Sequence, residues 1–368
     1  MEKERQRSRV CFISPKAYQL FNPKVKSTFG GAEVQLYLLA QEIIKDDSLD
    51  IHFMVADFGQ NKLEEYNQIK VWNSLNFKHN IIRQIGQFIS SFNRINADIY
   101  LQRTLTPLSG LIALYCKFKR KKLIYMVSHN SETDDTHNIY KHYISKKLAN
   151  LTFKIANVII VQNNYQADKL RELKRCQSVL IRSGYSINDF NKNAGEYILW
   201  VARSMPWKQP EKFIELAKNF PQEHFVMICP PATENPGLSD KLAQEASNIK
   251  NLRFIKFVPF IEIDDYFRKA KAFVNTSKYE GFPNTFIQAA KNKVPILSLA
   301  VNPDYFITKY GCGYYCNNDS ELLKKYLHRL TSDRESYNNM SQKAFQYAVI
   351  NHDINKNSDM LLTILKNL

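Results

Sequence analysis

The stretch KAFVNTSKYEGFPNTFIQAAKNKVPILSLA, Lys271 to Ala300, contains a complete strand–turn–helix–strand unit. "KAFVNTS" and "VPILSLA" are short apolar runs typical of buried strands. Between them, Pro283 suits the first position of a helix, where its missing N–H costs nothing, so we predict a helix from near Pro283 through Asn292. Strands joined through a helix in this way predict a parallel sheet and an α/β fold.

The same alternation of strand and helix patterns runs along most of the chain. A first series begins at "VCFIS" and ends at "SVLIRSGY", and a second begins at "YILWVAR". The polar, turn-rich stretch Ser183–Tyr197 divides them. We therefore predict two Rossmann-like parallel-sheet domains that face each other across a cleft, over residues 1–188 and 189–351. A last helix over about 352–368 is a candidate to pack back on the first domain.

Composition and charge narrow the class of protein. The 368 residues are 44% apolar and 23% charged, which is typical of a soluble globular protein of two domains. Of the net charge of +16, +12 lies in residues 1–185, which hold 28 Lys and Arg against 16 Asp and Glu. This excess predicts an anionic partner: a phosphate-bearing substrate, a membrane surface or a nucleic acid. No nucleic-acid module is recognisable, so nucleic acid is not expected. The basic run "KFKRKK", Lys117 to Lys122, is either a solvated helix end or a membrane-surface patch.

Targeting signals and cysteines indicate the compartment. The opening "MEKERQRSR" is followed by no apolar core of a secretory signal, and no apolar run reaches the roughly 18 residues of a membrane span. We expect a cytoplasmic protein, with peripheral contact at the inner face of the membrane as a second expectation. Six scattered cysteines predict reduced thiols. Cys312 and Cys316 have the spacing of metal ligands but lack a second ligand pair.

The first turn of the helix near Pro283 is a candidate anion site. The amides of Asn284, Thr285 and Phe286 would have no partner within the helix, and the helix dipole adds positive potential there. Glu280 lies one turn before this helix, and Gln288 lies one turn inside it. An anion next to a carboxylate suggests a phosphate ester that carries a polyhydroxyl group.

Further candidate residues follow other predicted strands. Arg203 comes directly after "YILWV", and Lys208 follows five residues later, so the two cations could neutralise a diphosphate. Gly30 and Gly31 precede a helix predicted to start near Ala32, where they would allow the backbone to approach a ligand closely. The dinucleotide-binding spacing of glycines is absent, which counts against nicotinamide chemistry.

Four stretches in this order, "FGGAEVQ", "VQNNYQADKL", "VARSMPWKQPEKF" and "SKYEGFPNTFIQAA", resemble the retaining GT-B glycosyltransferases of family 4. The resemblance covers the chain from Val10 to about Gly313. It implies that Glu280 contacts the donor sugar, that Arg203 and Lys208 bind the phosphates, and that His129 lies near the transferred sugar and the acceptor. The implied donor-binding residues are Gly30, Gly31, Phe282, Pro283, Asn284, Thr285 and Gln288.

The sequence departs from the family pattern at three places. Gln288 stands where the family has a second glutamate that holds the nucleotide ribose, and a neutral amide accepts hydrogen bonds more weakly than a carboxylate. Ala202 replaces the glycine that usually precedes the arginine. "CPPA", Cys229 to Ala232, stands in place of a glycine-rich turn, so no donor contact is assigned there.

The resemblance implies a retaining, metal-independent transferase. It would move a sugar from a UDP- or GDP-linked donor, which is a substrate and not a cofactor, to a glycan or lipid-linked acceptor. Such enzymes serve bacterial surface polysaccharide biosynthesis (capsule, O-antigen or exopolysaccharide). A nucleotide-sugar-binding protein with weak catalysis is the alternative. No Asp-x-Asp pair occurs in the sequence. The stretch "HNSETDDTH" offers a rival metal site made of His129, Asp134, Asp135 and His137.

Overall fold

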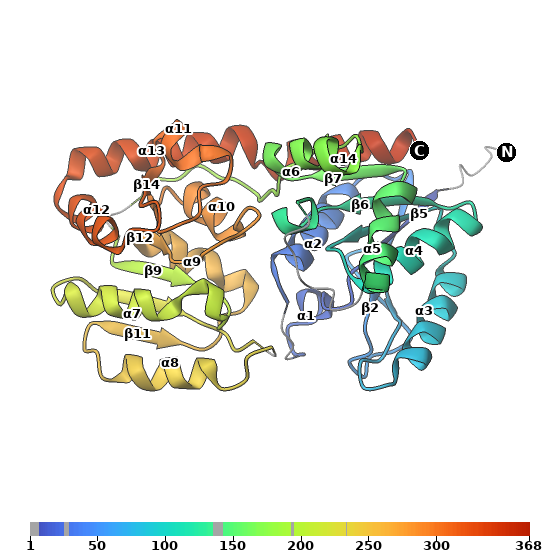
Figure 1. The fold of residues 1–368 in the computed structure, drawn as a ribbon, viewed down its shortest axis with the longest axis horizontal. Helices are drawn as coiled ribbons and strands as arrows, with labels where there is room; N and C mark the ends of the chain where they lie inside the picture. Colours follow the sequence, from blue (N-terminus) through green and yellow to red (C-terminus); the bar gives the residue numbers. More distant parts are fainter. Residues whose placement is uncertain (1–6, 26–28, 135–142, 193–194, 233) are drawn as a thin grey trace. The chain divides into compact units, whose positions relative to one another are not determined.

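The structure, a computed structural model, describes residues 7–25, 29–134, 143–192, 195–232 and 234–368 (Figure 1). The chain divides into two units: unit 1 holds the chain up to Gly184 together with Ile354–Leu368, and unit 2 holds Tyr185–Asp353. The first boundary falls inside the polar stretch that follows Ser183. Within unit 1, Gly184 lies so close to Ile354 that a Cβ atom at Gly184 would be 2.9 Å from the Ile354 Cα.

Unit 1 is built on an eight-stranded sheet in the order β3-β4-β2-β1-β5-β6-β7-β8. The strands are β1 (Ser8–Ile13), β2 (Leu49–Val55), β3 (Leu63–Tyr66), β4 (Ile69–Asn73), β5 (Ile99–Arg103), β6 (Lys122–Met126), β7 (Val158–Val161) and β8 (Val179–Leu180). Neighbouring strands pair in parallel, except that β3 and β4 form an antiparallel hairpin. Strand order reverses between β1 and β5, which makes their carboxyl ends the switch point of a doubly wound sheet.

Helices cover both faces of this sheet (Figure 1). They are α1 (Tyr18–Phe21), α2 (Gly31–Ile43), α3 (Ile81–Ile95), α4 (Pro107–Phe118), α5 (Tyr143–Ile155), α6 (Asn164–Lys169) and α14 (Ile354–Lys366), with short turns at Asn130–Glu132 and Leu170–Lys174. The chain's last helix, α14, packs against α2, and Lys366 Nζ lies 2.6 Å from Asp46 Oδ2. Unit 1 is therefore assembled from both ends of the chain.

Unit 2 has a six-stranded parallel sheet in the order β11-β10-β9-β12-β13-β14. Its strands are β9 (Tyr197–Val201), β10 (Phe225–Ile228), β11 (Leu252–Ile255), β12 (Ala270–Asn275), β13 (Ile296–Ser298) and β14 (Gly313–Tyr315). Its helices are α7 (Pro210–Asn219), α8 (Leu238–Ser247), α9 (Ile263–Lys269), α10 (Asn284–Lys291), α11 (Phe306–Tyr310), α12 (Ser320–Ser332) and α13 (Arg334–Asn351), with short turns at Pro206–Lys208, Phe260–Glu262 and Pro303–Tyr305. Strand order reverses between β9 and β12.

The central strands of each sheet are buried on both faces, which is why they are nearly continuous apolar runs. In unit 2, Phe213 packs between Trp200 and Phe225, with ring centroids 6.2 and 5.5 Å away. In unit 1, Phe92 of α3 lies against Tyr100 of β5 at 4.6 Å. These side chains fix the helices over the sheets and leave the loops after the strands to form sites.

The predicted α/β fold with two parallel-sheet domains is confirmed. That the domains face each other across a cleft stays a prediction. The hairpin of β3 with β4 and the helix α3 are not among the predicted elements; Gly86 and the pair Ser90–Ser91 weaken the helix propensity of α3. The helix after "EGF" begins at Asn284 and ends at Lys291, one residue later and one earlier than predicted.

Candidate functional site

The topology of unit 2 brings two of the candidate loops together. Strands β9 and β12 are hydrogen-bonded neighbours, and strand order reverses between them. Arg203–Lys208 follows β9, and the loop from Thr276 to Pro283 follows β12. In doubly wound sheets, ligands bind at the carboxyl ends of strands beside this reversal. The two loops are therefore placed where unit 2 would bind a ligand.

Lys208 and Glu280, which are 72 residues apart in sequence, form an ion pair. The side chains are 19% and 9% exposed, so the pair is largely shielded from solvent. Ser277 Oγ donates a second hydrogen bond to the same carboxylate, at 2.8 Å from Oε1. An ammonium group has three donors, so this contact leaves donors of Lys208 for a ligand phosphate.

Backbone contacts hold the two loops in register. The Lys278 amide donates to the Trp207 carbonyl at 2.8 Å, and Thr276 Oγ1 donates to the Lys208 carbonyl at 2.6 Å. Trp200 Nε1, inside the core, donates to Thr276 Oγ1 at 2.9 Å. The Lys208–Glu280 pair is thus fixed by hydrogen bonds that run back into the sheet.

Arg203 follows β9 directly, but a carboxylate that the sequence analysis did not single out lies beside it. Arg203 Nη1 is 3.5 Å from Glu234 Oε2, in the loop after β10. Both side chains are partly exposed, so the pair contributes little to stability. Ser204 ties these loops together, because its Oγ accepts a hydrogen bond from the Ala232 amide at 3.0 Å.

The N-terminus of α10 lies at the end of the loop that carries Glu280. Pro283 is the N-cap residue instead of the first helical residue, and no described side chain caps the helix. The Phe286 amide, one of the three predicted anion donors, bonds to the Pro283 carbonyl at 3.0 Å. Among described residues the Thr285 amide has no hydrogen-bond partner. The Phe286 amide is therefore already engaged within the protein, whereas the Thr285 amide is available to an anion.

Two predicted donor-binding residues differ in their surroundings. Gln288 is buried, and its side chain makes no hydrogen bond to a described residue. Phe282 belongs to an aromatic cluster in which its ring centroid is 4.8 Å from that of His352 and 5.3 Å from that of Phe306. Phe282 thus packs in the core of unit 2, whereas Gln288 keeps its amide group uncommitted.

An aromatic pair beside the site was not predicted from the sequence. Trp207 and Tyr279 precede Lys208 and Glu280 and stack on each other, with ring centroids 6.1 Å apart and 14° between the ring planes. Each aromatic residue stands directly before a candidate residue in the sequence, but local sequence gives no sign that the two rings meet. The pair forms part of the loop surface next to the ion pair.

Gly30, Gly31 and His129 lie in unit 1. Gly30 is the N-cap of α2, which begins at Gly31 instead of Ala32, and the Gly30 amide donates to Glu33 Oε2 at 2.7 Å. The φ of Gly30 is −119°, a value open to any residue. A phosphate at this helix would have to displace the carboxylate of Glu33 from the Gly30 amide.

His129 is exposed and begins the short turn Asn130–Glu132 after β6. The buried Glu132 closes this turn, because its carboxylate accepts hydrogen bonds from Tyr125 Oη at 2.6 Å and from the Ser128 amide at 3.2 Å. Asn130 Oδ1 accepts hydrogen bonds from Asn163 Nδ2 and Gln166 Nε2, both at 3.1 Å. The position of His129 is therefore set by a buried polar network.

Arg103 ends β5 at the switch point of unit 1 and was not predicted as a site residue. Its Nη2 lies 3.1 Å from both Gln162 Oε1 and Ser183 Oγ. A charged residue at the end of a buried strand was a usable signal, because such residues lie at the carboxyl edge of the sheet. This edge therefore carries a cation as well as His129.

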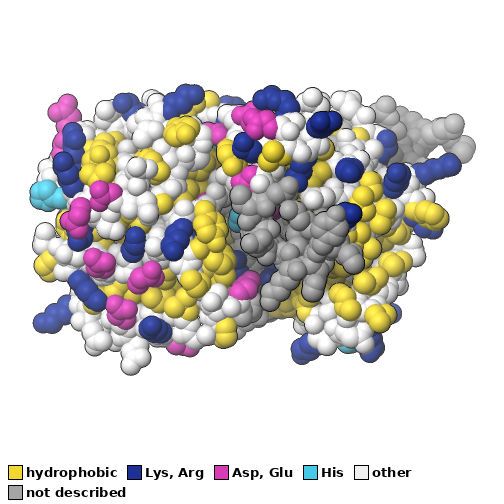
Figure 2. Space-filling view, viewed as in Figure 1, with side chains coloured by type: hydrophobic (Ala, Val, Ile, Leu, Met, Phe, Trp, Pro, Cys, Tyr) yellow, Lys and Arg dark blue, Asp and Glu magenta, His cyan; other side chains and the backbone are white. Residues whose placement is uncertain are grey.

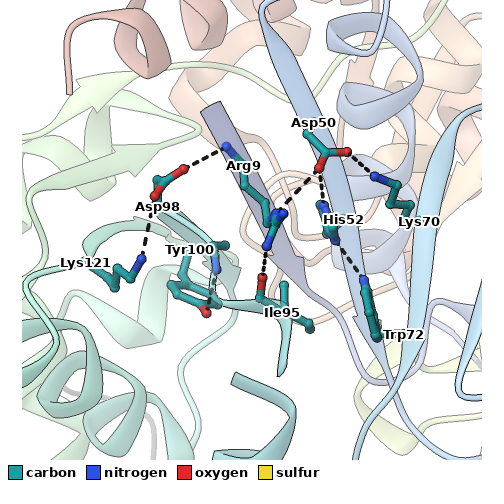
Figure 3. Close-up of polar contacts among 10 residues, drawn as sticks. Arg9, Asp50, His52, Lys70, Trp72, Ile95, Asp98, Tyr100 and Lys121 are labelled. Carbon is teal, nitrogen blue, oxygen red and sulfur yellow. Dashed lines mark hydrogen bonds and ion pairs between the residues drawn. The ribbon is translucent and has the colours of Figure 1, made fainter. Parts of the chain in front are cut away.

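A second polar cluster in unit 1 lies at the opposite, amino-terminal edge of the sheet (Figure 3). Asp50 is 2.9 Å from both His52 Nε2 and Lys70 Nζ, and Trp72 Nε1 donates to His52 Nδ1 at 2.8 Å. Burial alone would raise the pKa of Asp50, but hydrogen bonds from His52 and Lys70 outweigh it and hold the pKa at about 2. Burial lowers the pKa of His52 and outweighs the opposing attraction of Asp50. These partners join neighbouring strands, which is a structural role.

The sequence offers two candidate metal sites. Asp135 and His137 of the rival site lie outside the described residues. Cys312 and Cys316 are buried, and burial raises the pKa of each thiol to about 12, which disfavours the thiolate that binds metals. No group of three or more metal-ligating side chains occurs among the described residues.

Part of the chain matches a known protein family. Residues 186–347 match the family of glycosyl transferases group 1. The chain is 24% identical to alpha-monoglucosyldiacylglycerol synthase of Acholeplasma laidlawii, in an alignment that covers 66% of this chain and 69% of that protein.

Solved structures share the fold over nearly the whole length. Sucrose-phosphate synthase from Thermosynechococcus elongatus superposes with a TM-score of 0.81 at 13% identity, covering 98% of this chain and 99% of that one. Anabaena HepE, solved in complex with UDP and glucose, superposes with a TM-score of 0.74 at 14% identity, covering 98% and 100%. Residues 186–347 of the chain therefore match the model of the glycosyl transferases group 1 family, and the two units have the GT-B fold.

Proposed function

We propose that this protein is a retaining glycosyltransferase that moves a sugar from a nucleotide-sugar donor to a glycan or lipid-linked acceptor. The observation that carries the proposal is the Lys208–Glu280 pair at the reversal of strand order, where the loop after β9 meets the loop that leads into α10. A cation and a carboxylate held together there suit the two parts of a sugar nucleotide: the diphosphate and the hydroxyl groups of the sugar.

Lys208 and Arg203 would neutralise the diphosphate, with help from the Thr285 amide and the positive end of the α10 dipole. Glu280 would accept hydrogen bonds from the hydroxyls of the donor sugar. Gln288 would hold the ribose diol through its side-chain carbonyl. Because Lys208 and Glu280 are fixed before the donor binds, little reorganisation of these two groups is needed as charge develops on the leaving phosphate.

In the reaction, the bond between the anomeric carbon and the phosphate oxygen breaks, and the bonding pair leaves with the nucleoside diphosphate. The acceptor hydroxyl attacks the anomeric carbon from the same face, and its proton passes to the departing phosphate oxygen. Lys208 and Arg203 lower the barrier by stabilising the negative charge on that oxygen. The lack of an Asp-x-Asp pair in the sequence favours this neutralisation by side chains over a divalent metal.

The relatives support classes of donor and acceptor. HepE was solved with UDP and glucose, which makes UDP-glucose the first donor to test. The Acholeplasma laidlawii relative is named for a glucosyl diacylglycerol, which favours a lipid-linked acceptor. Surface polysaccharide biosynthesis, on such an acceptor, is the process we propose.

The test is transfer from a panel of UDP- and GDP-sugars, measured by release of the nucleoside diphosphate. We expect Lys208→Ala and Glu280→Ala each to lower kcat/KM by about a hundredfold or more, in line with the loss of one preorganised charged contact. Lys271 and Glu223 provide a matched control, because their side chains form an ion pair of 2.6 Å at the amino-terminal end of the same sheet. Lys271→Ala should leave kcat/KM nearly unchanged. An equal loss of kcat/KM in Lys208→Ala and Lys271→Ala would indicate a stability effect and contradict the proposal.

Gln288 favours a second candidate, a nucleotide-sugar-binding protein with weak catalysis, because it replaces a carboxylate expected at the ribose. Single-turnover assays distinguish the two functions. Bound donor that is neither transferred nor hydrolysed over hours would support the binding protein, and transfer within seconds would support the enzyme.

A further inference from the structure

Helix α3 in unit 1 carries two apolar stripes where one would suffice. The first stripe, Phe88, Phe92 and Ile95, is buried against the sheet. The second, Ile82, Ile85 and Ile89, has the i, i+3, i+7 spacing of a single helix stripe. Ile82 is 80% exposed and Ile89 is 47% exposed. A helix that covers a sheet needs only the buried stripe, so the exposed one calls for another explanation.

The exposed apolar surface extends beyond this stripe. Phe118, the last residue of α4, is 87% exposed. Helices α3 and α4 are in contact, because Tyr115 Oη donates to Asn93 Oδ1 at 3.0 Å and the rings of Phe92 and Tyr115 are 4.7 Å apart. We define the α3–α4 surface as Phe77, Ile81, Ile82, Ile85, Ile89, Leu114 and Phe118. Figure 2 shows apolar side chains over the part of unit 1 that carries these helices, with Lys and Arg side chains along its border.

The charged residues of the segment that carries this surface are almost all basic. From Tyr66 to Ser131 the chain has ten Lys and Arg residues and one acidic residue, Asp98. Asp98 is already engaged by Lys121 at 3.6 Å and by the Arg9 amide at 3.0 Å. Six cations on or next to α3 and α4 are exposed, and none forms an ion pair with a described residue: Lys78, Arg83, Arg94, Lys117, Lys119 and Arg120. Their charges are available to an external partner.

We propose that the α3–α4 surface docks on an anionic lipid bilayer. Exposed Ile and Phe side chains would enter the boundary between head groups and acyl chains, while the flanking cations would contact lipid phosphates. A nucleic acid would use the cations but leave Ile82 and Phe118 in water. The six exposed cations beside the surface have no ion-pair partner among the described residues, so a second copy of it would repel the first. A bilayer matches both the apolar side chains and the charge.

The test measures co-sedimentation of the full chain with vesicles, without nucleotide sugar, so its outcome is independent of the proposed transfer reaction. The vesicles are phosphatidylcholine alone, or phosphatidylcholine with about a third phosphatidylglycerol. We expect the protein to bind the anionic vesicles. This binding should weaken as the salt concentration rises from about 0.1 to 0.5 M, but part of it should remain. Ile82→Ser with Phe118→Ser should weaken it about tenfold or more. Lys117→Gln, Lys119→Gln and Arg120→Gln should weaken it about fivefold for each charge lost.

Ile261→Ser with Ile350→Ser is the matched control, because these residues are 78% and 67% exposed on unit 2. This variant should bind vesicles as the wild type does, and thermal melting should show all variants folded. Undiminished binding of the Ile82 and Phe118 variant would overturn the proposal, as would equal binding to both vesicle types. A salt-sensitive complex with RNA and no vesicle binding would assign the surface to nucleic acid. A solution dimer that dissociates on Ile82→Ser would assign it to a second copy of the chain.

Discussion

At the scale of single residues, Gln288 is the position where the candidate site departs most from the family pattern that the sequence resembles. It is buried and makes no side-chain hydrogen bond to a described residue. We expect Gln288→Glu to lower the KM for the donor about fivefold with little change in kcat, because a carboxylate accepts hydrogen bonds from a diol more strongly than an amide does. Initial-rate kinetics with varied donor check this.

Without ligand, the same substitution should make the protein less stable. A buried carboxylate without a partner is costly, so Gln288→Glu should lower the melting temperature without ligand and increase the rise that UDP produces. A donor KM that stays the same or rises would contradict a ribose-binding role for this position.

His52 makes the stability of unit 1 depend on pH. Trp72 can only donate a hydrogen bond, so His52 Nδ1 must accept it and the ring is held neutral with its proton on Nε2. Because burial lowers the folded-state pKa of His52, acid favours the unfolded state, and the free energy of unfolding should fall as pH drops below about 6.5. Asp50 keeps its contribution over this range and loses it as pH falls toward its pKa of about 2.

Denaturant unfolding of the wild type and of His52→Gln between pH 7 and pH 5 measures this effect. The wild type should lose stability over that range, and the variant should lose less. Parallel curves for the two proteins would show that His52 is not the group responsible.

At the scale of elements, replacing glycine by alanine should have opposite effects on stability in the neighbouring helices α3 and α4. A Cβ atom at Gly110 of α4 would lie 2.0 Å from the carbonyl oxygen of Leu148 in α5, whereas one at Gly86 of α3 would meet nothing within 4 Å. We expect Gly110→Ala to destabilise the protein by about 3 kcal/mol or more, because the two helices must separate. Gly86→Ala should stabilise it by up to about 1 kcal/mol.

Thermal unfolding of the two variants beside the wild type distinguishes packing from propensity. Since both substitutions are the same and both lie within helices, helix propensity alone would raise the melting temperature of each. A rise for Gly110→Ala would show that α4 and α5 are less closely packed than described.

At the scale of the whole molecule, unit 1 depends on the last helix of the chain. Leu361 of α14 is buried, while its neighbour Met360 is 43% exposed. We expect Leu361→Asp to detach α14 from α2 and to speed hydrogen exchange in β1 and β2, while β9 and β12 of unit 2 keep their protection. Met360→Asp is the matched control and should leave both units protected. Equal loss of protection in both units would mean that they unfold together.

Much of this architecture follows from local pattern. Continuous apolar runs such as "YILWV" and "KAFVN" predict buried parallel strands, because only both-face burial favours such runs. The helices between them were predicted from period and from Pro and Gly positions. Residues directly after strands, including Arg203 and Glu280, could be assigned to the binding edge of a sheet, since all parallel strands end there.

Other features depend on contacts between distant residues. The order of the strands, and with it the meeting of Lys208 with Glu280, arises when β9 and β12 pair, and no local pattern records that pairing. The same is true of Glu234 beside Arg203, of the network around Glu132, and of the ring pair Trp207 and Tyr279.

The sequence by itself determined the kinds of element, their order along the chain and the residues that follow each strand. Tertiary structure decided which of those residues touch, which amides are already engaged, as at Gly30, and which apolar stripe of α3 stays exposed. The physical reason is that hydrophobic period and turn chemistry act over a few residues, whereas pairing and burial are settled by segments that meet only when the chain folds.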